Sequence, residues 1–460
     1  IQAWGAGLKS RINALPPETR TDYRAYVAAR KVPVISHEIG HWCVYPNFDE
    51  VRKYTGYLKP KNFEIFKEKL SEHGMLHQAR PFLLASGKLQ VLCYKEEIES
   101  ALRTPGMGGF QLLDLHDFPG QGTALVGVLD PFWEEKGYVT AREFRRFCGP
   151  TVLLARMEKR VFTQSEHFNA DIEIAHFGPV PIHGSRVRWR FVNDAGRTIR
   201  SGTLPYQVIL TDNAIPLGRI SFGLGDGPAP ARYKLVASLD RPRSSAPGLP
   251  RQRIDNDWDV WIYPRDVDQT PPSSVRIVNH LDEQTAQYLQ SGGTVLWLLP
   301  PTRVRPDPKL GKVELGFSSI FWNTAWTGRQ APHTLGVLCN PRHPLFAEFP
   351  TDFHSNWQWW YIVTRAGAMI LDGLPKDLQP LVQVVDDWFT ARKLGLVFEA
   401  KVGRGRLLVC SIDLERDLQN NPVARQFRYS LFKYITSPHF SPKSEITLDQ
   451  ARSLTTPPGS

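Results

Sequence analysis

Several near-continuous apolar runs in the C-terminal part of the chain constrain its fold more than any other sequence feature. They are WDVWIYP (258–264), VRIVNH (275–280), TVLWLLP (294–300), LGLVFEA (394–400) and RLLVCSI (406–412). Runs of this kind are typical of strands that are covered on both faces. Between two of them, DEQTAQYLQSGG (282–293) has the pattern of a helix that stops at glycine. A strand, a helix and a strand in this order predict a βαβ unit of a Rossmann-like, doubly wound α/β domain.

The middle of the chain has a different pattern, in which apolar and polar residues alternate. Examples are DIEIAHF (171–177), SRVRWRFV (185–192) and RYKLVASL (232–239). NDAG (193–196) follows the second of these runs and is a turn signal. Strict alternation is expected of strands that are buried on one face only. This region is therefore predicted to form an immunoglobulin-like β-sandwich.

Length and composition set the domain count and exclude two classes of protein. A chain of 460 residues suggests about three domains. We place them at 1–165, 166–255 and 256–440, with 441–460 as a polar tail. The 13 Trp, 24 Phe and 14 Tyr are too many for a disordered chain. No apolar run reaches the roughly 18 residues that a membrane span requires, so no membrane span is expected.

The net charge of +10 could suggest a nucleic-acid-binding protein, but the distribution of the charge along the chain does not favour one. Residues 186–255 hold twelve Lys and Arg against five Asp and Glu, on a strand-rich segment without interleaved aromatic stacking motifs. An anionic polysaccharide, or simple solubility, accounts better for this charge. The five cysteines contain no CxxC pair, which excludes a disulfide scaffold and a zinc ribbon.

The string His37-Glu38-Ile39-Gly40-His41 satisfies HExxH, which in zinc peptidases places two histidine ligands on one face of a helix. Here the context disfavours a helix. VPVIS (32–36) before the string is a strand candidate, and Pro46 follows His41 by five residues. The second interpretation is that Glu38 lies at the carboxyl end of a strand, where the catalytic groups of a TIM barrel are found.

At this point the sequence resembles a known family. PVISHEIG (33–40) looks like the strand-seven nucleophile segment of glycoside hydrolase family two, the family of β-galactosidases, β-glucuronidases and β-mannosidases. Tyr45-Pro46-Asn47-Phe48 resembles the loop after that strand, and residues 78–103 resemble the helix before strand eight. Residues 109–138, from GFQLLDL to WEEKGY, are similar to strand eight and its Asp-x-x-Pro loop. The resemblance covers residues 32–138, and its motifs occur in the family's order.

The resemblance implies that residues 1–165 are the C-terminal portion of a (β/α)8 barrel in a retaining exo-glycosidase. Glu38 would be the nucleophile, forming a glycosyl-enzyme by double displacement, with no metal or organic cofactor. The substrate would be a terminal β-linked sugar of a plant or algal oligosaccharide or polysaccharide, with a β-galactoside as first choice. In this family the acid/base is a Glu over a hundred residues before the nucleophile. Only 37 residues precede Glu38, so we expect the acid/base to be absent from this sequence.

The remaining candidate site residues surround this segment. Glu96, Glu97 and Glu99 are poor substitutes for the acid/base, because their helix would direct them to the outside of the barrel. The strand-eight Trp that the family commonly carries is replaced here by Leu112 and Leu113, which puts the sugar specificity in doubt. Candidate substrate contacts are His37, His41, Trp42, Trp4, Asp114, His116 and Asp117.

The C-terminal region resembles the glutamine-amidotransferase-like domains that some glycosidases carry. Such domains need a cysteine on a strand-to-helix elbow, and neither Cys339 nor Cys410 fits, so a structural or oligomerising role is expected. Because the chain starts at Ile1, an upstream polypeptide or a second copy could complete the barrel. A periplasmic or secreted bacterial protein is favoured over a cytoplasmic one. The alternatives are a non-catalytic carbohydrate-binding protein with an incomplete barrel, and an HExxH zinc metallopeptidase.

Overall fold

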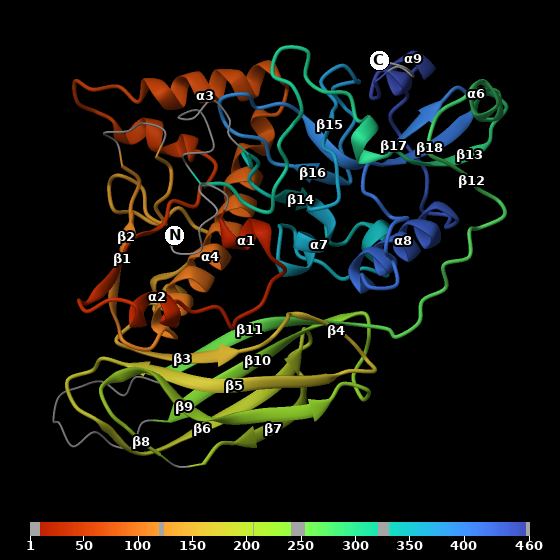
Figure 1. Ribbon diagram of the computed structural model, residues 1–460. Helices are drawn as coiled ribbons and strands as arrows, with labels where there is room; N and C mark the ends of the chain where they lie inside the picture. The colour runs from red at the N-terminus through yellow and green to blue at the C-terminus, as the bar shows by residue number, and fades with distance from the viewer. Residues whose placement is uncertain (1–9, 119–123, 206, 241–253, 321–330, 457–460) are drawn as a thin grey trace. The chain divides into compact units, whose positions relative to one another are not determined.

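A computed structural model describes residues 10–118, 124–205, 207–240, 254–320 and 331–456 of the chain (Figure 1). It divides the chain into two compact units. The first contains Ile1–His41, Val91–Leu115 and Gly137–Arg265, and the second contains Trp42–Gln90, His116–Lys136 and Asp266–Ser460. Trp4 lies outside the described residues. No helix in the described ranges combines the length and the apolar character that crossing a bilayer requires.

The first unit contains a short parallel sheet at the predicted nucleophile segment. β1 (Val34–Gly40) pairs in parallel with β2 (Met107–Leu113). The chain between them forms α3 (Lys61–Glu72) and α4 (Ala79–Leu102). Parallel strands need a long crossover, and helices supply it here. The strands predicted near 32–36 and 109–115 are therefore confirmed, but β1 and β2 form a two-stranded sheet, and the described residues contain no closed barrel.

Short helices accompany this region. α4 matches the helix expected over residues 78–103 and accommodates both Ser86 and Gly87 in its interior. Ser86 donates its hydroxyl to the carbonyl of Phe82, one turn earlier. The short elements are α1 (Arg11–Ala14), α2 (Arg24–Ala28), η2 (Phe48–Lys53), η3 (Leu76–Gln78) and α5 (Ala141–Phe144).

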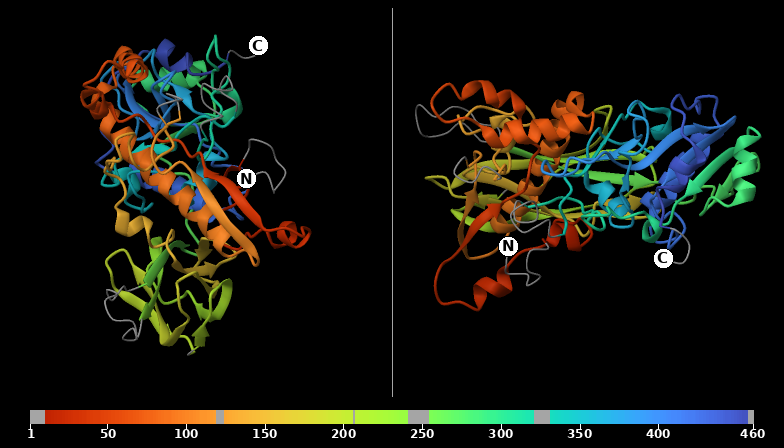
Figure 2. Two further views of the ribbon diagram at one scale, coloured as in Figure 1. Left: turned by 90° about the vertical axis from the view of Figure 1, so that its left-hand side faces the viewer. Right: turned by 90° about the horizontal axis from the view of Figure 1, so that it is seen from above.

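Two open sheets in the first unit share one hydrophobic core, and Figure 2 shows their yellow and green strands from two further sides. One sheet contains β3 (Thr151–Arg156), β5 (His167–His176) and β9 (Asp212–Gly223). The other contains β4 (Val161–Thr163), β11 (Ile254–Tyr263), β10 (Ala231–Asp240), β6 (Ile182–Asn193), β7 (Thr198–Thr203) and β8 (Gln207–Ile209). Phe168, Phe191 and Leu235 are buried in the common core. Alternation in the sequence thus produced strands with one face turned inward.

β11 is the strand for which the sequence prediction fails. The run 258–264 is predicted to belong to the α/β sheet, but β11 pairs antiparallel with β10 and in parallel with β4. Trp258, Val260 and Ile262 join the sandwich core, while Trp261 and Tyr263 on the alternate positions are buried as well. A sandwich strand that is covered on both faces has the same apolar run as a strand of an α/β sheet.

The second unit contains a mixed seven-stranded sheet in the order β12-β13-β18-β17-β16-β14, with β15 beside β17. β12, β13 and β18 are parallel, and β17 is antiparallel to β18. α6 (Glu283–Gln290) joins β12 to β13, which confirms the predicted βαβ unit. The strands are β12 (Arg276–Val278), β13 (Thr294–Leu298), β14 (Val337–Cys339), β15 (Met369–Ile370), β16 (Val382–Val384), β17 (Leu394–Val402) and β18 (Gly405–Cys410).

The C-terminal segment packs onto this sheet, contrary to the prediction of a polar tail over 441–460. Ile446, Ala451 and Leu454 are buried in the same core as Val295 and Val409. The remaining helices are η4 (Pro301–Arg303), η6 (Pro344–Phe346), η7 (Trp357–Trp359), α7 (Trp360–Val363), α8 (Pro422–Ile435) and α9 (Leu448–Arg452). Three apolar residues spaced among polar ones are enough to anchor the segment.

Candidate functional site

Glu38 lies near the carboxyl end of β1, between two histidines. Its Oε1 is 3.0 Å from Nε2 of His37, and its Oε2 is 3.3 Å from Nε2 of His41. The Glu38 side chain is 36% exposed, while those of His37 and His41 are 75% and 8% exposed. One carboxylate oxygen is thus held from the solvent side and the other from the interior.

The backbone that presents Glu38 is irregular. Ser36 pairs with Phe110 and Ile39 with Leu112, so β1 has one more residue than β2 over this stretch. Such a bulge turns a side chain away from the regular alternation. Glu38 itself has a φ of 94°, in the left-handed region that non-glycine residues rarely adopt. Backbone of this kind is concentrated at functional sites.

Gly40, two residues further on, is required by both its conformation and its surroundings. Its φ is 112°, and a Cβ at this position would lie 2.2 Å from Cε1 of Tyr94. His41 follows with a φ of 53°. Three of the four residues from Glu38 to His41 therefore have positive φ values, and the close approach of Tyr94 on α4 holds this turn in place.

The two histidines differ in their surroundings. Nδ1 of His37 is 2.8 Å from Oε1 of Gln111 on β2. Both ring nitrogens of His37 therefore lie beside a side-chain oxygen, one of Gln111 and one of Glu38. Burial lowers the pKa of His41, and the nearby Glu38 opposes this only in part. Glu38 therefore contacts one exposed imidazole and one buried imidazole.

This geometry does not fit a zinc peptidase. The HExxH string lies on a strand and the turn after it, so its histidines do not share one helical face. Among the described residues, one group of three His, Cys, Asp or Glu side chains brings its ligand atoms within 4.8 Å of one another, and it is His333, Asp386 and Asp387. Neither His37 nor His41 belongs to it. The metallopeptidase alternative is therefore wrong.

Asp114, in the first unit, immediately follows β2. Gly40 pairs with Leu113, so Asp114 comes directly after the strand end that lies beside the Glu38 turn. Its side chain is half-buried, and Oδ1 accepts the backbone N–H of Leu115 at 2.6 Å. The hydroxyl of Tyr94 donates to the carbonyl of Asp114 at 3.3 Å. Tyr94 thus contacts both the Gly40 turn and the end of β2.

Trp42, His116 and Asp117 belong to the second unit. Trp42, a candidate substrate contact in the sequence, is buried in the core. Asp117 is also buried; it forms an ion pair with Lys136 at 2.6 Å and accepts the N–H of Gly127 at 2.9 Å. The carboxylate of Asp117 is therefore paired inside the protein rather than exposed to solvent. His116 is half-buried and packs against Trp133, with ring centroids 4.5 Å apart.

Glu96, Glu97 and Glu99, expected to be poor substitutes for the acid/base, are buried as well. Oε1 of Glu96 contacts Arg11 at 3.2 Å and Arg103 at 3.0 Å, and Oε2 contacts Arg160 at 3.3 Å. Glu99 accepts the indole N–H of Trp258 at 2.8 Å. The glutamates of α4 therefore stabilise the interior of the first unit and are not candidates for proton transfer.

Glu50 is a buried carboxyl group that sequence reasoning missed. It lies on η2 in the second unit, and neither of its oxygens has a hydrogen-bond partner among the described residues. Burial raises the pKa of Glu50 to about 8, with Lys136 opposing and Asp117 adding to the shift. The group is therefore largely protonated at neutral pH. DEVRK (49–53) gave no signal of this, because a charged residue in such a string is usually exposed.

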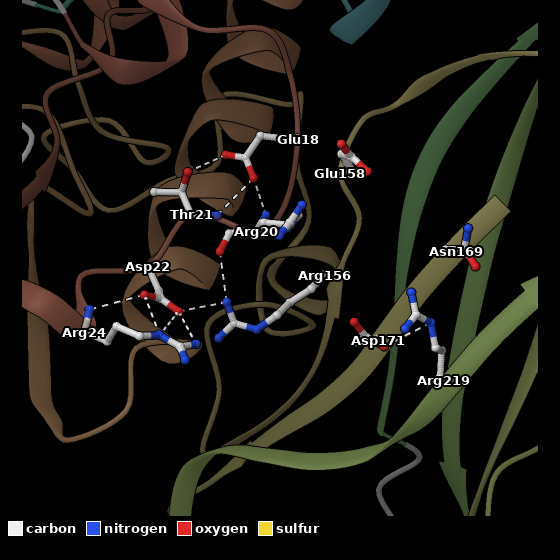
Figure 3. A pocket seen from close by; sticks show the side chains of 10 residues that line it. All are labelled: Glu18, Arg20, Thr21, Asp22, Arg24, Arg156, Glu158, Asn169, Asp171 and Arg219. Carbon is white, nitrogen blue, oxygen red and sulfur yellow. Dashed lines mark hydrogen bonds and ion pairs between the residues drawn. The ribbon is translucent and has the colours of Figure 1, made fainter. Parts of the chain in front are cut away.

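A polar cavity of about 840 Å³ lies in the first unit (Figure 3). Its lining charges are largely paired with one another. Asp22 accepts from Arg24 at 2.6 Å and from Arg156 at 2.8 Å, and Arg219 lies 3.6 Å from Asp171. Neither Glu38 nor its histidine neighbours line this cavity. It is therefore a surface hollow built on ion pairs and separate from the Glu38 turn.

Comparison with known proteins finds two family models and several solved structures. Residues 166–264 match a domain of unknown function, DUF8488, and residues 276–456 match another, DUF8487. No curated protein matches the chain. Neither family model spans half of the chain, so the comparisons assign no family to the whole.

The structural similarities are weak and partial. The Parabacteroides merdae β-glucuronidase is 11% identical with a TM-score of 0.19, covering 32% of this chain and 21% of that one. A putative β-galactosidase from Bacteroides fragilis is 12% identical with a TM-score of 0.16, covering 32% and 24%. The sporulation control protein Spo0M from Bacillus subtilis is 13% identical with a TM-score of 0.19, covering 25% and 50%. The chain thus spans half or less of each of these proteins.

Proposed function

We propose that this chain takes part in retaining glycoside hydrolysis of the family-two type, with Glu38 as the nucleophile. The observation that carries the proposal is the position of Glu38. It is a partly exposed carboxylate near the carboxyl end of a parallel strand, with each oxygen in contact with an imidazole nitrogen. The sequence resemblance over residues 32–138 supports the same role. The substrate class we favour is a terminal β-linked sugar. A β-galactoside is our first choice, followed by a β-glucuronide and a β-mannoside.

In this mechanism Oε1 or Oε2 of Glu38 attacks the anomeric carbon of the sugar. The bond from that carbon to the leaving oxygen breaks, and a glycosyl ester forms on Glu38. Water then attacks the same carbon, which releases the sugar and restores the carboxylate. His37 contacts one oxygen of Glu38 from the solvent side, and the buried His41 orients the second oxygen.

The proton for the leaving group comes from a second carboxyl group, on the order of 5 Å from the first in retaining enzymes. The glutamates of α4 are excluded from this role by their burial and ion pairs. In the family that the sequence resembles, the acid/base precedes the nucleophile by over a hundred residues, and 37 residues precede Glu38 here. A strongly acidic leaving group departs from the substrate without protonation by the acid/base. The role of Glu38 as nucleophile can therefore be tested by itself.

The test is the release of dinitrophenolate from the 2,4-dinitrophenyl β-galactoside, β-glucuronide and β-mannoside by the full chain. We expect release from one of the three glycosides, and loss of that release to background in Glu38→Gln. Glu64→Gln on α3 is the matched control and should behave as the unmodified chain does. Equal rates for Glu38→Gln and the unmodified chain would overturn the proposal.

A second candidate is a non-catalytic carbohydrate-binding protein. It is favoured by the two-stranded β1-β2 sheet and by the lack of a closed barrel in the described ranges. The same assay separates the two, because a binding protein retains polysaccharide without releasing dinitrophenolate from any of the three glycosides.

A further inference from the structure

Trp133, in the second unit, combines two unfavourable features. Its side chain is 62% exposed, and its φ is 64°. Exposing a large apolar ring forgoes the free energy of burying it, and a left-handed conformation costs a bulky residue about 1–2 kcal/mol. Trp133 is therefore unfavourable in both its exposure and its backbone conformation. Residues of this kind are concentrated at functional sites, so a functional role is expected for Trp133.

The loop that presents Trp133 is held in one conformation. The carboxylate of Asp130 accepts the N–H groups of Phe132 at 2.8 Å and Glu134 at 3.0 Å. The carbonyl of Asp130 accepts the N–H of Trp133 at 3.0 Å. Asp130 is fully buried and forms an ion pair with Lys53. The indole is therefore displayed by a fixed turn and is not on a loosely held loop.

His116 completes the surface around the indole. Its ring lies 4.5 Å from that of Trp133, between centroids, at a tilt of 48°. Nδ1 of His116 lies 2.6 Å from the carbonyl of Asp117, which fixes the imidazole in turn. Glu134 and Glu135 follow Trp133 in the chain and are exposed, and Oε2 of Glu134 lies 2.8 Å from Nζ of Lys53. We call these four residues, His116, Trp133, Glu134 and Glu135, the Trp133 platform.

We propose that the Trp133 platform binds a neutral pyranose ring of a polysaccharide. An exposed, rigid indole offers a flat apolar face on which the C–H face of a sugar ring can pack. Carboxylates beside it accept hydrogen bonds from sugar hydroxyls. The charge of the platform selects among sugars, because Lys53 pairs with Glu134 but the exposed carboxylate of Glu135 repels the carboxylate of a uronic acid. This inference does not depend on Glu38 being a nucleophile.

The test is native electrophoresis of the full chain in gels that contain β-galactan, β-mannan or polygalacturonate. We expect β-galactan or β-mannan to retard the chain and polygalacturonate to have no effect. Trp133→Gly removes the indole, and glycine adopts a φ of 64° without strain, so the loop should keep its conformation. Its affinity for the retarding polysaccharide should be roughly 3- to 10-fold weaker.

Tyr57→Ala is the matched control, because Tyr57 is a fully exposed aromatic residue of the second unit outside the platform. It should bind as the unmodified chain does. Glu38→Gln should also bind unchanged, which separates the platform from the proposed hydrolysis. Undiminished binding by Trp133→Gly, or no retardation of the unmodified chain by either neutral polysaccharide, would refute the proposal.

Discussion

Nε2 of the buried His41 lies 3.3 Å from Oε2 of the partly exposed Glu38. Because burial lowers the pKa of His41, this imidazole is neutral at neutral pH and contacts the carboxylate without adding a positive charge. His37 lies on the solvent side, with Nε2 3.0 Å from Oε1 of Glu38. Each oxygen of the carboxylate is thus in contact with an imidazole nitrogen, one from the interior and one from the solvent side.

The Glu38 turn should depend on Gly40. Gly40→Ala places a Cβ against the ring of Tyr94 and forces a positive φ on alanine. We expect a loss of about 2 kcal/mol or more in the free energy of unfolding, measured in urea. The loss should be smaller when Tyr94 is also replaced by leucine, since the two residues are in contact. Gly56→Ala, which meets nothing within 4 Å, is the control. A Gly40→Ala variant as stable as the control would contradict the role of this contact.

The buried carboxylate of Glu96 should be essential to the first unit. Glu96→Gln keeps the shape but leaves Arg11, Arg103 and Arg160 without their common anion. Breaking a buried pair of this kind costs about 3–5 kcal/mol, so the midpoint of thermal unfolding should fall markedly. Glu72→Gln, which removes the exposed partner of Lys69, should leave that midpoint unchanged. Equal midpoints for the two variants would show that the buried network contributes little.

Glu50 should make stability depend on pH. Its pKa is about 8 in the folded chain and about 4.5 when unfolded. Between these values the unfolded state loses the proton first, so the folded state binds more protons and stability falls as pH rises. Glu50→Gln should remove this slope, which is about 1.4 kcal/mol per pH unit at most. Urea unfolding at pH 4.5, 6 and 8 measures it. The stability difference between variant and unmodified chain should grow with pH, and a constant difference would contradict the burial of Glu50.

Local sequence patterns predicted the elements near the site well. Alternation and apolar runs are properties of a few consecutive residues, and they located β1, β2 and the unit β12-α6-β13. Pro46 and the strand-like VPVIS correctly indicated that the HExxH string is not helical. The domain boundaries and the role of each site residue remain predictions.

Burial that depends on distant partners could not be predicted in the same way. Glu96 is buried because Arg11 and Arg160 reach it from 85 and 64 residues away. Asp117 is buried because Lys136 neutralises it. β11 joins the sandwich because Trp261 is covered on the face away from the core. The local sequence around Glu96 and Asp117 is compatible with either burial or exposure, and that of β11 with either sheet. Long-range packing decides in each case.

The central claim is that Glu38 forms the covalent bond to the sugar. The most direct measurement is mass spectrometry of the full chain after reaction with a 2-deoxy-2-fluoro glycosyl fluoride of the galacto, glucurono or manno series. These reagents form the ester but hydrolyse it slowly. We predict that one series adds a single glycosyl group, which fragmentation of peptide 32–52 assigns to Glu38. A label on any other residue, or none in all three series, would contradict the account.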